Sequence, residues 1–535
     1  MGWEDRLVVW GLAIQLVIWG WGGAPVVEAQ GYWETVVNNA GISTMHSAVA
    51  HDGNVVLLDR TNVGPSQLKL APDNCRDNLA DRSLKHDCTA HSALFSPNSN
   101  KVRPLKVITD TWCSSGQFDG SGKLVQTGGD ADGVKKSNVQ IRHFTPCGKG
   151  ACDWVELNGG LQEGRWYASN QILPDGTQIV VGGRGVATLE YVPANGRGTY
   201  YLPLLSKSND AQMDNLYPFV HLLPNNQLYI FANRDSCLYD WKTNKVARDY
   251  PTMPGEPRNY PSAGSSVMLP LSASNDFGNA EVLICGGAQY GAYLNPAGQP
   301  ASQSCGRITP LAAGAGWVME NMPQRRLMGD MILLPTRDVL IINGAGGGAQ
   351  GWGNAVNPVK TPVLYKPNNA AGARFQTLTA SPVPRVYHST ANLLPDGRIL
   401  VAGSNTHQFY TLTGYLPTEL RIEAFSPPYL ASNRPTFTAA PGGLKHGAGF
   451  TATVKVDNAK HIELNMASAP LVTHSFAQGQ RLLQLQVGAP IAAGGGKFRV
   501  DSKAPPTSAV APAGYYMLFP LVDGIVGSAS WVRIG

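Results

Sequence analysis

The chain has 535 residues and a formal net charge of +5, from 42 basic and 37 acidic residues. So small a charge on so long a chain, with the basic residues scattered, excludes the basic patch that nucleic-acid-binding proteins need. Only 15% of the residues are charged, 60 are glycine and 38 are proline. This composition is typical of a turn-rich, all-β secreted protein, and the length predicts more than one domain.

The N-terminus has the pattern of a secretion signal. Arg6 precedes the apolar stretch Leu7–Ala24, and small residues lead to a cleavage site after Ala29. We predict a signal peptide over residues 1–29 and a protein that is secreted, extracellular or in the cell wall. A membrane anchor is the alternative, but Gln15 and the glycines of this stretch argue against a lasting span.

The cysteines predict disulfides, the default use of this residue in a secreted chain. The three pairs that we expect are Cys75–Cys88, Cys147–Cys152 and Cys285–Cys305. Cys113 and Cys237 are left over. Either they pair with each other, or Cys237 is a buried free thiol and Cys113 has another role.

A turn followed by a short apolar strand and small residues recurs seven times. The copies lie at 48–60, 116–130, 170–184, 220–234, 278–289, 331–346 and 391–405. A period of about 50 residues, with four short strands and a di-glycine, is typical of a kelch-type β-propeller blade. We therefore predict an all-β fold in which residues 30–423 form a seven-bladed β-propeller.

The repeat pattern stops near Phe425 and gives way to alternating strands such as "HIELNMAS", "RLLQLQV" and "YYMLFPLVD". Their spacing predicts a C-terminal immunoglobulin-like β-sandwich over residues 424–535. We expect the sandwich to lie beside the propeller disc.

Chemically capable side chains precede the inner strands of several repeats. At this position the chain has Cys113 in "TWCSSG", Tyr167 in "GRWYASN", and the neighbours Tyr387 and His388 in "RVYHST". Propellers place ligand sites on the central axis, so we expect these residues to converge there. For Tyr387 and His388 we expect an irregular backbone, because neighbours in a regular strand point to opposite faces.

Histidines supply further candidates for the same site. Two other repeats carry His46 and His221, and His474 lies at a strand-to-loop junction of the predicted sandwich. Two imidazoles with two phenols form a nitrogen–oxygen ligand set, which favours copper(II) over zinc. A phenol binds as phenolate only when a metal or cation drives off its proton, because its ordinary pKa is about 10.

Five motifs occur in order along the chain: "TWCSSGQFDGSGKLVQTGGD", "GRWYASNQILPDGTQIVVGG", "PRVYHSTANLLPDGRILVAGSN", "LVTHSFAQGQRLLQL" and "PAGYYMLFPLVDG". Together they resemble the copper radical oxidase family, and within it the glyoxal oxidase branch with its plant members. Galactose oxidase is a more distant relative. The resemblance covers nearly the whole chain after the leader.

The resemblance implies a protein-derived cofactor. Cys113 matches the cysteine that forms a thioether to a tyrosine ring carbon, and Tyr167 matches that tyrosine, a copper ligand that stores a radical. Trp166 stands beside it, either as an indole stacked over the radical or as an aromatic wedge in blade packing.

The same resemblance implies the remaining copper ligands. Tyr387 matches the axial tyrosine that takes the substrate hydroxyl proton, and His388 and His474 match the two imidazole ligands.

The activity that the resemblance implies is a copper-dependent oxidase that converts small aldehydes of the glyoxal or methylglyoxal type to carboxylic acids and reduces O2 to H2O2. A primary alcohol or galactose-type oxidase on the same centre is the alternative. A non-catalytic kelch propeller that binds cell-wall polysaccharide is an alternative of another class. The expected partners are an aldehyde or alcohol substrate and O2, with a peroxidase as activator and cell-wall polysaccharide as further candidates, and neither nucleic acid nor membrane.

Overall fold

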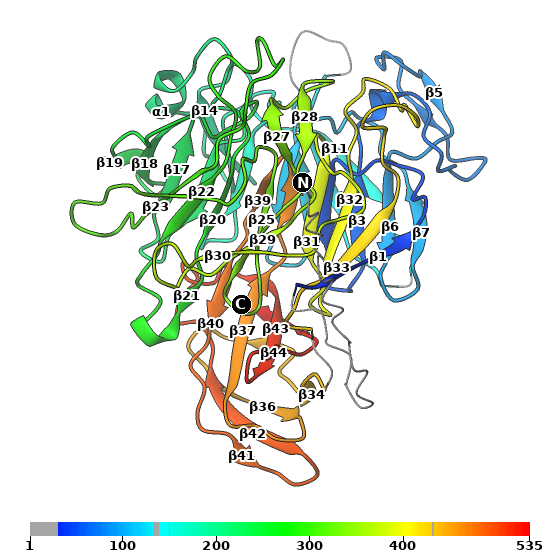
Figure 1. Cartoon of the computed structure of the whole chain (residues 1–535). Coiled ribbons are helices and arrows are strands. Elements are labelled where there is room, and N and C mark those ends of the chain that lie inside the picture. Colours follow the sequence, from blue (N-terminus) through cyan, green and yellow to red (C-terminus); the bar gives the residue numbers. More distant parts are fainter. Residues whose placement is uncertain (1–29, 132–137, 149, 431–432) are drawn as a thin grey trace, which may run out of the picture.

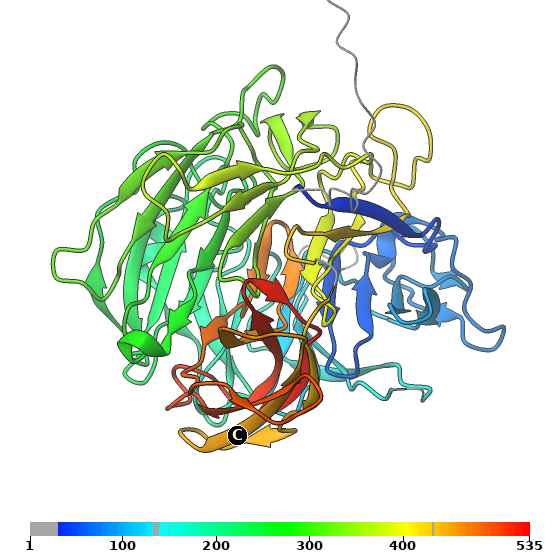
Figure 2. The ribbon, with the colours of Figure 1, turned by 60° about the horizontal axis from the view of Figure 1, so that its bottom comes forward.

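The computed structural model describes residues 30–131, 138–148, 150–430 and 433–535, so the predicted signal peptide lies outside the described residues. An upper group of sheets stands on a smaller lower group, which is drawn in orange and red (Figure 1). In the turned view these C-terminal sheets lie across the bottom of the larger group (Figure 2). No helix in the described ranges is long and apolar enough to cross a membrane.

The upper group contains seven blades, each with four antiparallel strands taken here in order from the inner to the outer strand. The first two blades are β2 (His46–Val49), β3 (Val55–Leu58), β6 (Ser92–Ser96) and β7 (Lys101–Leu105), then β8 (Ser115–Phe118), β9 (Leu124–Thr127), β10 (Gln140–Phe144) and β11 (Trp154–Gly160). The third and fourth are β12 (Ser169–Ile172), β13 (Gln178–Val181), β14 (Thr188–Val192) and β15 (Tyr200–Tyr201), then β16 (Phe219–Leu222), β17 (Leu228–Ala232), β18 (Asp235–Asp240) and β19 (Lys245–Asp249).

The remaining three blades follow the same order. They are β20 (Ser265–Met268), β22 (Val282–Cys285), β23 (Ser304–Ile308) and β24 (Val318–Asn321), then β25 (Asp330–Leu333), β26 (Val339–Ile342), β29 (Val363–Tyr365) and β30 (Phe375–Thr377), and finally β31 (Ser389–Leu393), β32 (Ile399–Gly403), β33 (Ile422–Ser426) and β1 (Tyr32–Val37). The seven apolar repeats seen in the sequence are the second strands of these blades, so the predicted fold class is confirmed.

Pairing between the two ends of the upper group closes the ring. Strand β1, from the start of the described chain, pairs antiparallel with β33 as the outer strand of the seventh blade. The predicted division between residues 423 and 424 falls within β33, which is held in this blade by pairing with β32.

A hairpin from the C-terminal region enters the middle of the ring. Strand β38 (Leu471–Thr473) pairs with β39 (Phe476–Gln478) and with β2 of the first blade, where Thr473 lies opposite His46. Figure 1 shows β39 among the blades, above the other C-terminal strands. The turn of this hairpin is therefore carried onto the propeller axis.

Two sheets make up the C-terminal β-sandwich, as predicted. One contains β21 (Leu271–Ser272), β40 (Leu482–Gln484), β37 (Ile462–Ser468), β43 (Gly514–Val522), β45 (Ser530–Ile534) and β35 (Gly443–Leu444), with β44 (Ile525–Val526) paired to β43. The other contains β34 (Thr436–Ala439), β36 (Gly449–Lys455), β42 (Lys497–Lys503) and β41 (Ile491–Ala492). Val454 and Val500 of the second sheet share one buried cluster with Leu464 and Leu518 of the first, so apolar burial joins the two layers.

Short elements decorate the blades. They are the hairpins β4 (Arg76–Asp77) with β5 (His86–Asp87) and β27 (Ala345–Gly348) with β28 (Ala355–Pro358), the helix α1 (Pro203–Lys207), and the 3-10 turns η1 (Thr61–Val63) and η2 (Ala273–Asn275). All three predicted disulfides are present. Cys113 and Cys237 are both free and buried, so they do not pair with each other.

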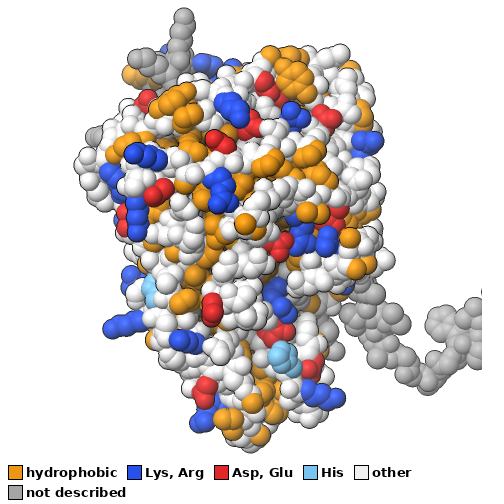
Figure 3. All heavy atoms as spheres, turned by 90° about the vertical axis from the view of Figure 1, so that its left-hand side faces the viewer, with side chains coloured by type: hydrophobic (Ala, Val, Ile, Leu, Met, Phe, Trp, Pro, Cys, Tyr) orange, Lys and Arg blue, Asp and Glu red, His pale blue; other side chains and the backbone are white. Residues whose placement is uncertain are grey.

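Charged side chains are interspersed on the face in Figure 3, with basic and acidic groups side by side. This face carries no stripe of basic residues, in keeping with the small net charge.

Candidate metal centre

The residues singled out from the sequence meet on the propeller axis. Cys113, Tyr167 and His388 lie directly before the inner strands β8, β12 and β31, and His474 lies in the turn between β38 and β39. All four, with Tyr387, are at most 4% exposed. The structure thus brings together all five predicted copper and cofactor residues from three blades and the C-terminal hairpin.

The backbone at these positions is left-handed. The φ angles are +52° at Cys113, +67° at Tyr167, +61° at His388 and +46° at His474. This region is uncommon for residues other than glycine and costs about 1–3 kcal/mol, so the surrounding structure must hold it. The irregular backbone expected at Tyr387 and His388 is confirmed. The unusual φ turns each side chain inward before regular pleating begins.

Backbone hydrogen bonds link the left-handed residues from blade to blade. The Tyr167 amide donates to the Cys113 carbonyl at 2.9 Å, and the Tyr217 amide donates to the Tyr167 carbonyl at 2.9 Å. Tyr217 also has a positive φ, +48°, two residues before β16. The residues that precede the inner strands of neighbouring blades are therefore hydrogen-bonded to each other through their backbones.

Buried arginines brace the two tyrosines. Arg165 lies two residues before Tyr167 and donates to the Gly182 carbonyl at 2.7 Å, while Arg385 lies two residues before Tyr387 and donates to the Gly403 carbonyl at 2.7 Å. Each guanidinium also pairs with a buried carboxylate of its own blade, Arg165 with Glu190 at 2.7 Å and Arg385 with Glu423 at 2.8 Å. These bonds hold the start of each inner strand against its second strand.

The two imidazoles are suited to a metal. Neither ring nitrogen of His388 has a hydrogen-bond partner among the described residues, although both are buried. The His474 ring lies 4.9 Å from the His388 ring, and its Nδ1 is hydrogen-bonded to the Thr473 hydroxyl at 2.6 Å. That bond orients the ring and leaves Nε2 toward the centre. Burial lowers the pKa of both histidines well below the usual value, so both are neutral and can offer a lone pair.

The two predicted phenols are joined by a third, Tyr260, which the sequence reasoning missed. Its hydroxyl oxygen lies 3.3 Å from that of Tyr167 and 3.2 Å from that of Tyr387. Burial raises the pKa of all three phenols above the usual value. The only sequence signal for Tyr260 is its place two residues after the buried Arg258, as in Arg165-x-Tyr167.

Cys113 lies against the same group. Its Sγ is 3.2 Å from Nε2 of His474, and the possible ligand atoms of Cys113, His388 and His474 lie within 4.8 Å of one another. Burial raises the pKa of the Cys113 thiol well above its usual value. Cys237, in β18 of the fourth blade, is a separate buried thiol.

Aromatic rings surround the centre. Trp166 lies with its ring centroid 4.8 Å from that of Tyr167, tilted by 35°. Tyr217, also missed, stacks on His474 at 4.9 Å and donates its hydroxyl to the Ser114 carbonyl at 2.9 Å. These contacts hold the rings in place.

The other candidate histidines stay outside the ligand group. Nε2 of His46 is hydrogen-bonded to the Thr111 carbonyl at 3.0 Å, and burial lowers the pKa of His46 to about 4. His221 is hydrogen-bonded to the Ser266 hydroxyl at 2.8 Å. Both have protein partners, in contrast to His388.

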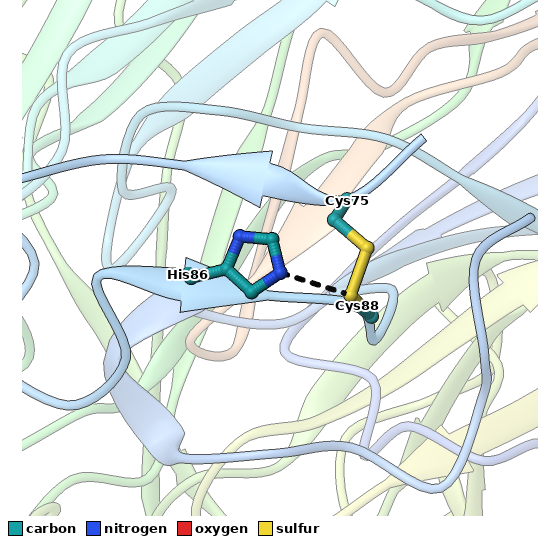
Figure 4. A group of neighbouring side chains, drawn as sticks. All are labelled: Cys75, His86 and Cys88. Carbon is teal, nitrogen blue, oxygen red and sulfur yellow. Dashed lines mark hydrogen bonds between the residues drawn. A yellow bond between two sulfur atoms is a disulfide. The ribbon is translucent and has the colours of Figure 1, made fainter. Parts of the chain in front are cut away.

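A second group of possible ligands, Cys75, His86 and Cys88, lies on the surface at β4 and β5. Its two sulfurs form a disulfide, and His86 Nε2 lies 3.4 Å from Cys88 Sγ (Figure 4). Oxidised sulfurs offer no thiolate, so this group is not a metal site in the described state.

The central group fits copper. Two neutral imidazoles and two phenols supply the nitrogen and oxygen donors that copper(II) prefers. Both buried ring nitrogens of His388 lack a hydrogen-bond partner in the described part of the chain, which suits a metal ligand. His388, His474, Tyr167 and Tyr387 are the residues that would hold the ion.

Comparisons with known proteins show which families the chain resembles. The family described as Glyoxal oxidase N-terminus matches residues 45–429, and the family described as Galactose oxidase-like, Early set domain, matches residues 434–534. A solved structure titled as a novel fungal alcohol oxidase of the AA5 family in complex with copper has a TM-score of 0.71 and 19% identity, over 94% of this chain and 99% of the other. At this identity the match shows the fold.

Curated relatives have a higher sequence identity to this chain than that solved structure has. "Aldehyde oxidase GLOX" of Vitis pseudoreticulata is 52% identical over 518 residues, which are 95% of this chain and 98% of that protein. "Aldehyde oxidase GLOX1" of Arabidopsis thaliana is 39% identical, over 95% of this chain and 85% of that protein, and a galactose oxidase of Gibberella zeae is 24% identical, over 79% and 61%. The chain therefore belongs to the copper radical oxidase family, in its glyoxal oxidase branch.

Proposed function

We propose that the protein is a secreted copper radical oxidase that converts small aldehydes, in their hydrated form, to carboxylic acids. The hydrate loses two electrons and two protons, and O2 takes up both to become H2O2. The observation that carries this proposal is the convergence of four donors beside Cys113, where both ring nitrogens of His388 have no hydrogen-bond partner within the described ranges. The names of the plant relatives favour an aldehyde as the substrate.

A two-electron oxidation needs two one-electron centres, because copper, when bound, exchanges one electron and acts as a Lewis acid. The second centre in this proposal is Tyr167, joined to Cys113 by a thioether. The hydrogen bond from the Tyr167 amide to the Cys113 carbonyl supports the link, because it keeps the two residues adjacent.

Each side chain then has a distinct role. Tyr387, as phenolate, accepts the proton of the substrate hydroxyl, and the oxidised Tyr167 takes a hydrogen atom from the substrate carbon. His388 and His474 would hold the ion together with these two tyrosines, and all four side chains are buried, as a radical site requires. The three disulfides and the apolar leader support secretion.

A primary alcohol or galactose-type substrate on the same centre is the second candidate, favoured by the fold match to a fungal alcohol oxidase. A peroxide-coupled assay of the copper-loaded protein with glyoxal, methylglyoxal, glycerol and galactose decides between them. We expect peroxide from the two aldehydes. Peroxide from galactose alone would overturn the aldehyde assignment, and no peroxide from any substrate would favour a non-catalytic propeller.

The thioether has its own test, by peptide mass after full reduction. The Cys113 and Tyr167 peptides should remain joined, with two hydrogens missing for one new C–S bond. Separate peptides of unmodified mass would overturn the radical cofactor.

A further inference from the structure

Four aromatic rings form a continuous row from the centre to the surface. The Trp166 ring lies 4.8 Å from the Tyr167 ring, Trp112 lies 4.9 Å from Trp166, and Trp352 stacks on Trp112 at 5.4 Å with an angle of 14°. Trp352 follows the β27 strand and is 37% exposed, whereas Tyr167 is 4% exposed. The row therefore connects a buried phenol to solvent through three indoles.

We infer that this row is an electron-transfer path, by which a one-electron oxidant that touches Trp352 at the surface oxidises Tyr167 without entering the centre. The inference rests on the proposed radical function of Tyr167. The oxidant is an outer-sphere acceptor, such as a metal complex or an oxidised haem protein. Indoles and phenols are the side chains that exchange single electrons most readily, and ring contact keeps each step short.

Electrons and protons balance along the row. One electron leaves Tyr167 and passes through the three indoles to the oxidant, which is reduced by one unit, and no bond between heavy atoms changes. Where Tyr167 still carries its phenol proton, its hydroxyl donates to that of Tyr260 at 3.3 Å, and the Tyr260 hydroxyl lies 3.2 Å from that of Tyr387. This chain would carry the proton to Tyr387 when bound copper keeps Tyr387 as a phenolate.

The surroundings of the indoles favour transient oxidation of these rings over a stable indole radical. Nε1 of Trp112 and Nε1 of Trp166 are buried without a hydrogen-bond partner among the described residues, so an oxidised indole there has no base to take its proton. The Arg60 guanidinium lies 5.0 Å from the Trp112 ring and 4.9 Å from the Trp352 ring. Its positive charge disfavours an indole radical cation at Trp112 or Trp352, so the stable oxidised residue is Tyr167.

The first test mixes copper-loaded, reduced protein with hexachloroiridate(IV) and follows the radical by stopped-flow absorbance and electron paramagnetic resonance. Trp352→Phe and Trp112→Phe should each slow radical formation by about tenfold or more, equal to about 1.4 kcal/mol in the barrier. The control is Trp317→Phe, an indole at the outer edge of the ring that donates to the Pro251 carbonyl and contacts none of the row. Equal rates in wild type and Trp352→Phe would overturn the path.

The second test needs neither copper nor turnover. Metal-free protein is treated with the same oxidant, and Tyr167→Phe removes the final electron donor. Peptide mass spectra of this variant should therefore show more oxygen-addition products at Trp352 and Trp112 than wild type does. Oxidation at Trp317 should not increase. Unchanged oxidation at Trp352 would overturn the path. If these products accumulate while copper-loaded wild type gives no radical signal, the path stands and the proposed function fails.

Discussion

Tyr387 and His388 are consecutive residues, yet their rings stack with centroids 3.8 Å apart. Neighbours in a regular strand point to opposite faces, and here β31 begins only at Ser389, after the left-handed His388. Pro395 follows Arg385 by ten positions, whereas Pro174 follows Arg165 by nine in the third blade. The left-handed residue comes three positions after the arginine in the seventh blade, at His388, but two positions after it in the third, at Tyr167. This one extra residue lets two adjacent side chains turn toward the same centre.

Replacing His388 should separate metal binding from stability. His388→Leu removes two buried nitrogens that have no hydrogen-bond partner among the residues that the structure describes. The free energy of unfolding of the metal-free protein should therefore be unchanged or about 1–2 kcal/mol higher. Added copper should then raise the melting temperature of wild type and not of the variant. His46→Leu is the control, since His46 has a protein partner, and should lose stability but keep copper uptake. Equal copper stabilisation in His388→Leu would rule out this ligand.

Tyr260→Phe should slow the reaction while leaving the fold intact. The hydroxyl that it removes lies between those of Tyr167 and Tyr387, so both phenols lose a neighbour that orients them. We expect kcat to fall by about tenfold with little change in KM, and the pH profile of kcat to shift. Tyr229→Phe removes a buried hydroxyl in β17, in a different buried cluster from Tyr167, Tyr260 and Tyr387, and should leave kcat unchanged. An unaltered pH profile in Tyr260→Phe would argue against this role.

Acid should destabilise the protein through its buried imidazoles. Burial lowers the pKa of His221 to about 3, whereas an unfolded histidine titrates near about 6.5. The unfolded chain therefore binds more protons, and the stability from neutral His221 is complete above about pH 6.5 and is lost as the pH falls toward 3. In His221→Gln the slope of the unfolding free energy against pH should drop by about 1.4 kcal/mol per pH unit between these limits. The same slope in both proteins would contradict the prediction.

The buried ion pair between Arg385 and Glu423 in the seventh blade should contribute strongly to stability. Glu423→Ala leaves the fully buried Arg385 guanidinium without its ion-pair partner, so we expect a loss of about 3–5 kcal/mol in denaturant unfolding. Glu34→Ala breaks the exposed pair between Glu34 and Arg398 and should cost at most about 1 kcal/mol. Similar losses of unfolding free energy in the two variants would show that the Arg385–Glu423 pair contributes no more than a surface ion pair.

Much of the fold could be predicted because its signals are local. Each second strand is a short buried run, such as Val55–Leu58 or Val339–Ile342, bounded by turn residues. The cysteine pairs are also local, since the partners are 5 to 20 residues apart. Motifs before the inner strands pointed to Cys113, Tyr167, Tyr387 and His388 for the same reason.

Tyr260 and the path through Trp112 to Trp352 carry no such signal. The contacts of these residues depend on how separate blades pack together. Tyr260, for example, contacts tyrosines that lie 93 and 127 positions away in the sequence. His474 was found from its motif, but its route to the axis, on a hairpin that pairs with β2 at the other end of the chain, was not.

The repeating strands, the disulfides and the residue types at the centre can be read from the sequence, because hydrophobic period, turn residues and motif spacing act over a few residues. How these pieces meet depends on long-range packing. Ring closure sets blade-to-blade hydrogen bonds, and the left-handed φ angles that aim Cys113, Tyr167, His388 and His474 persist only because packing holds them.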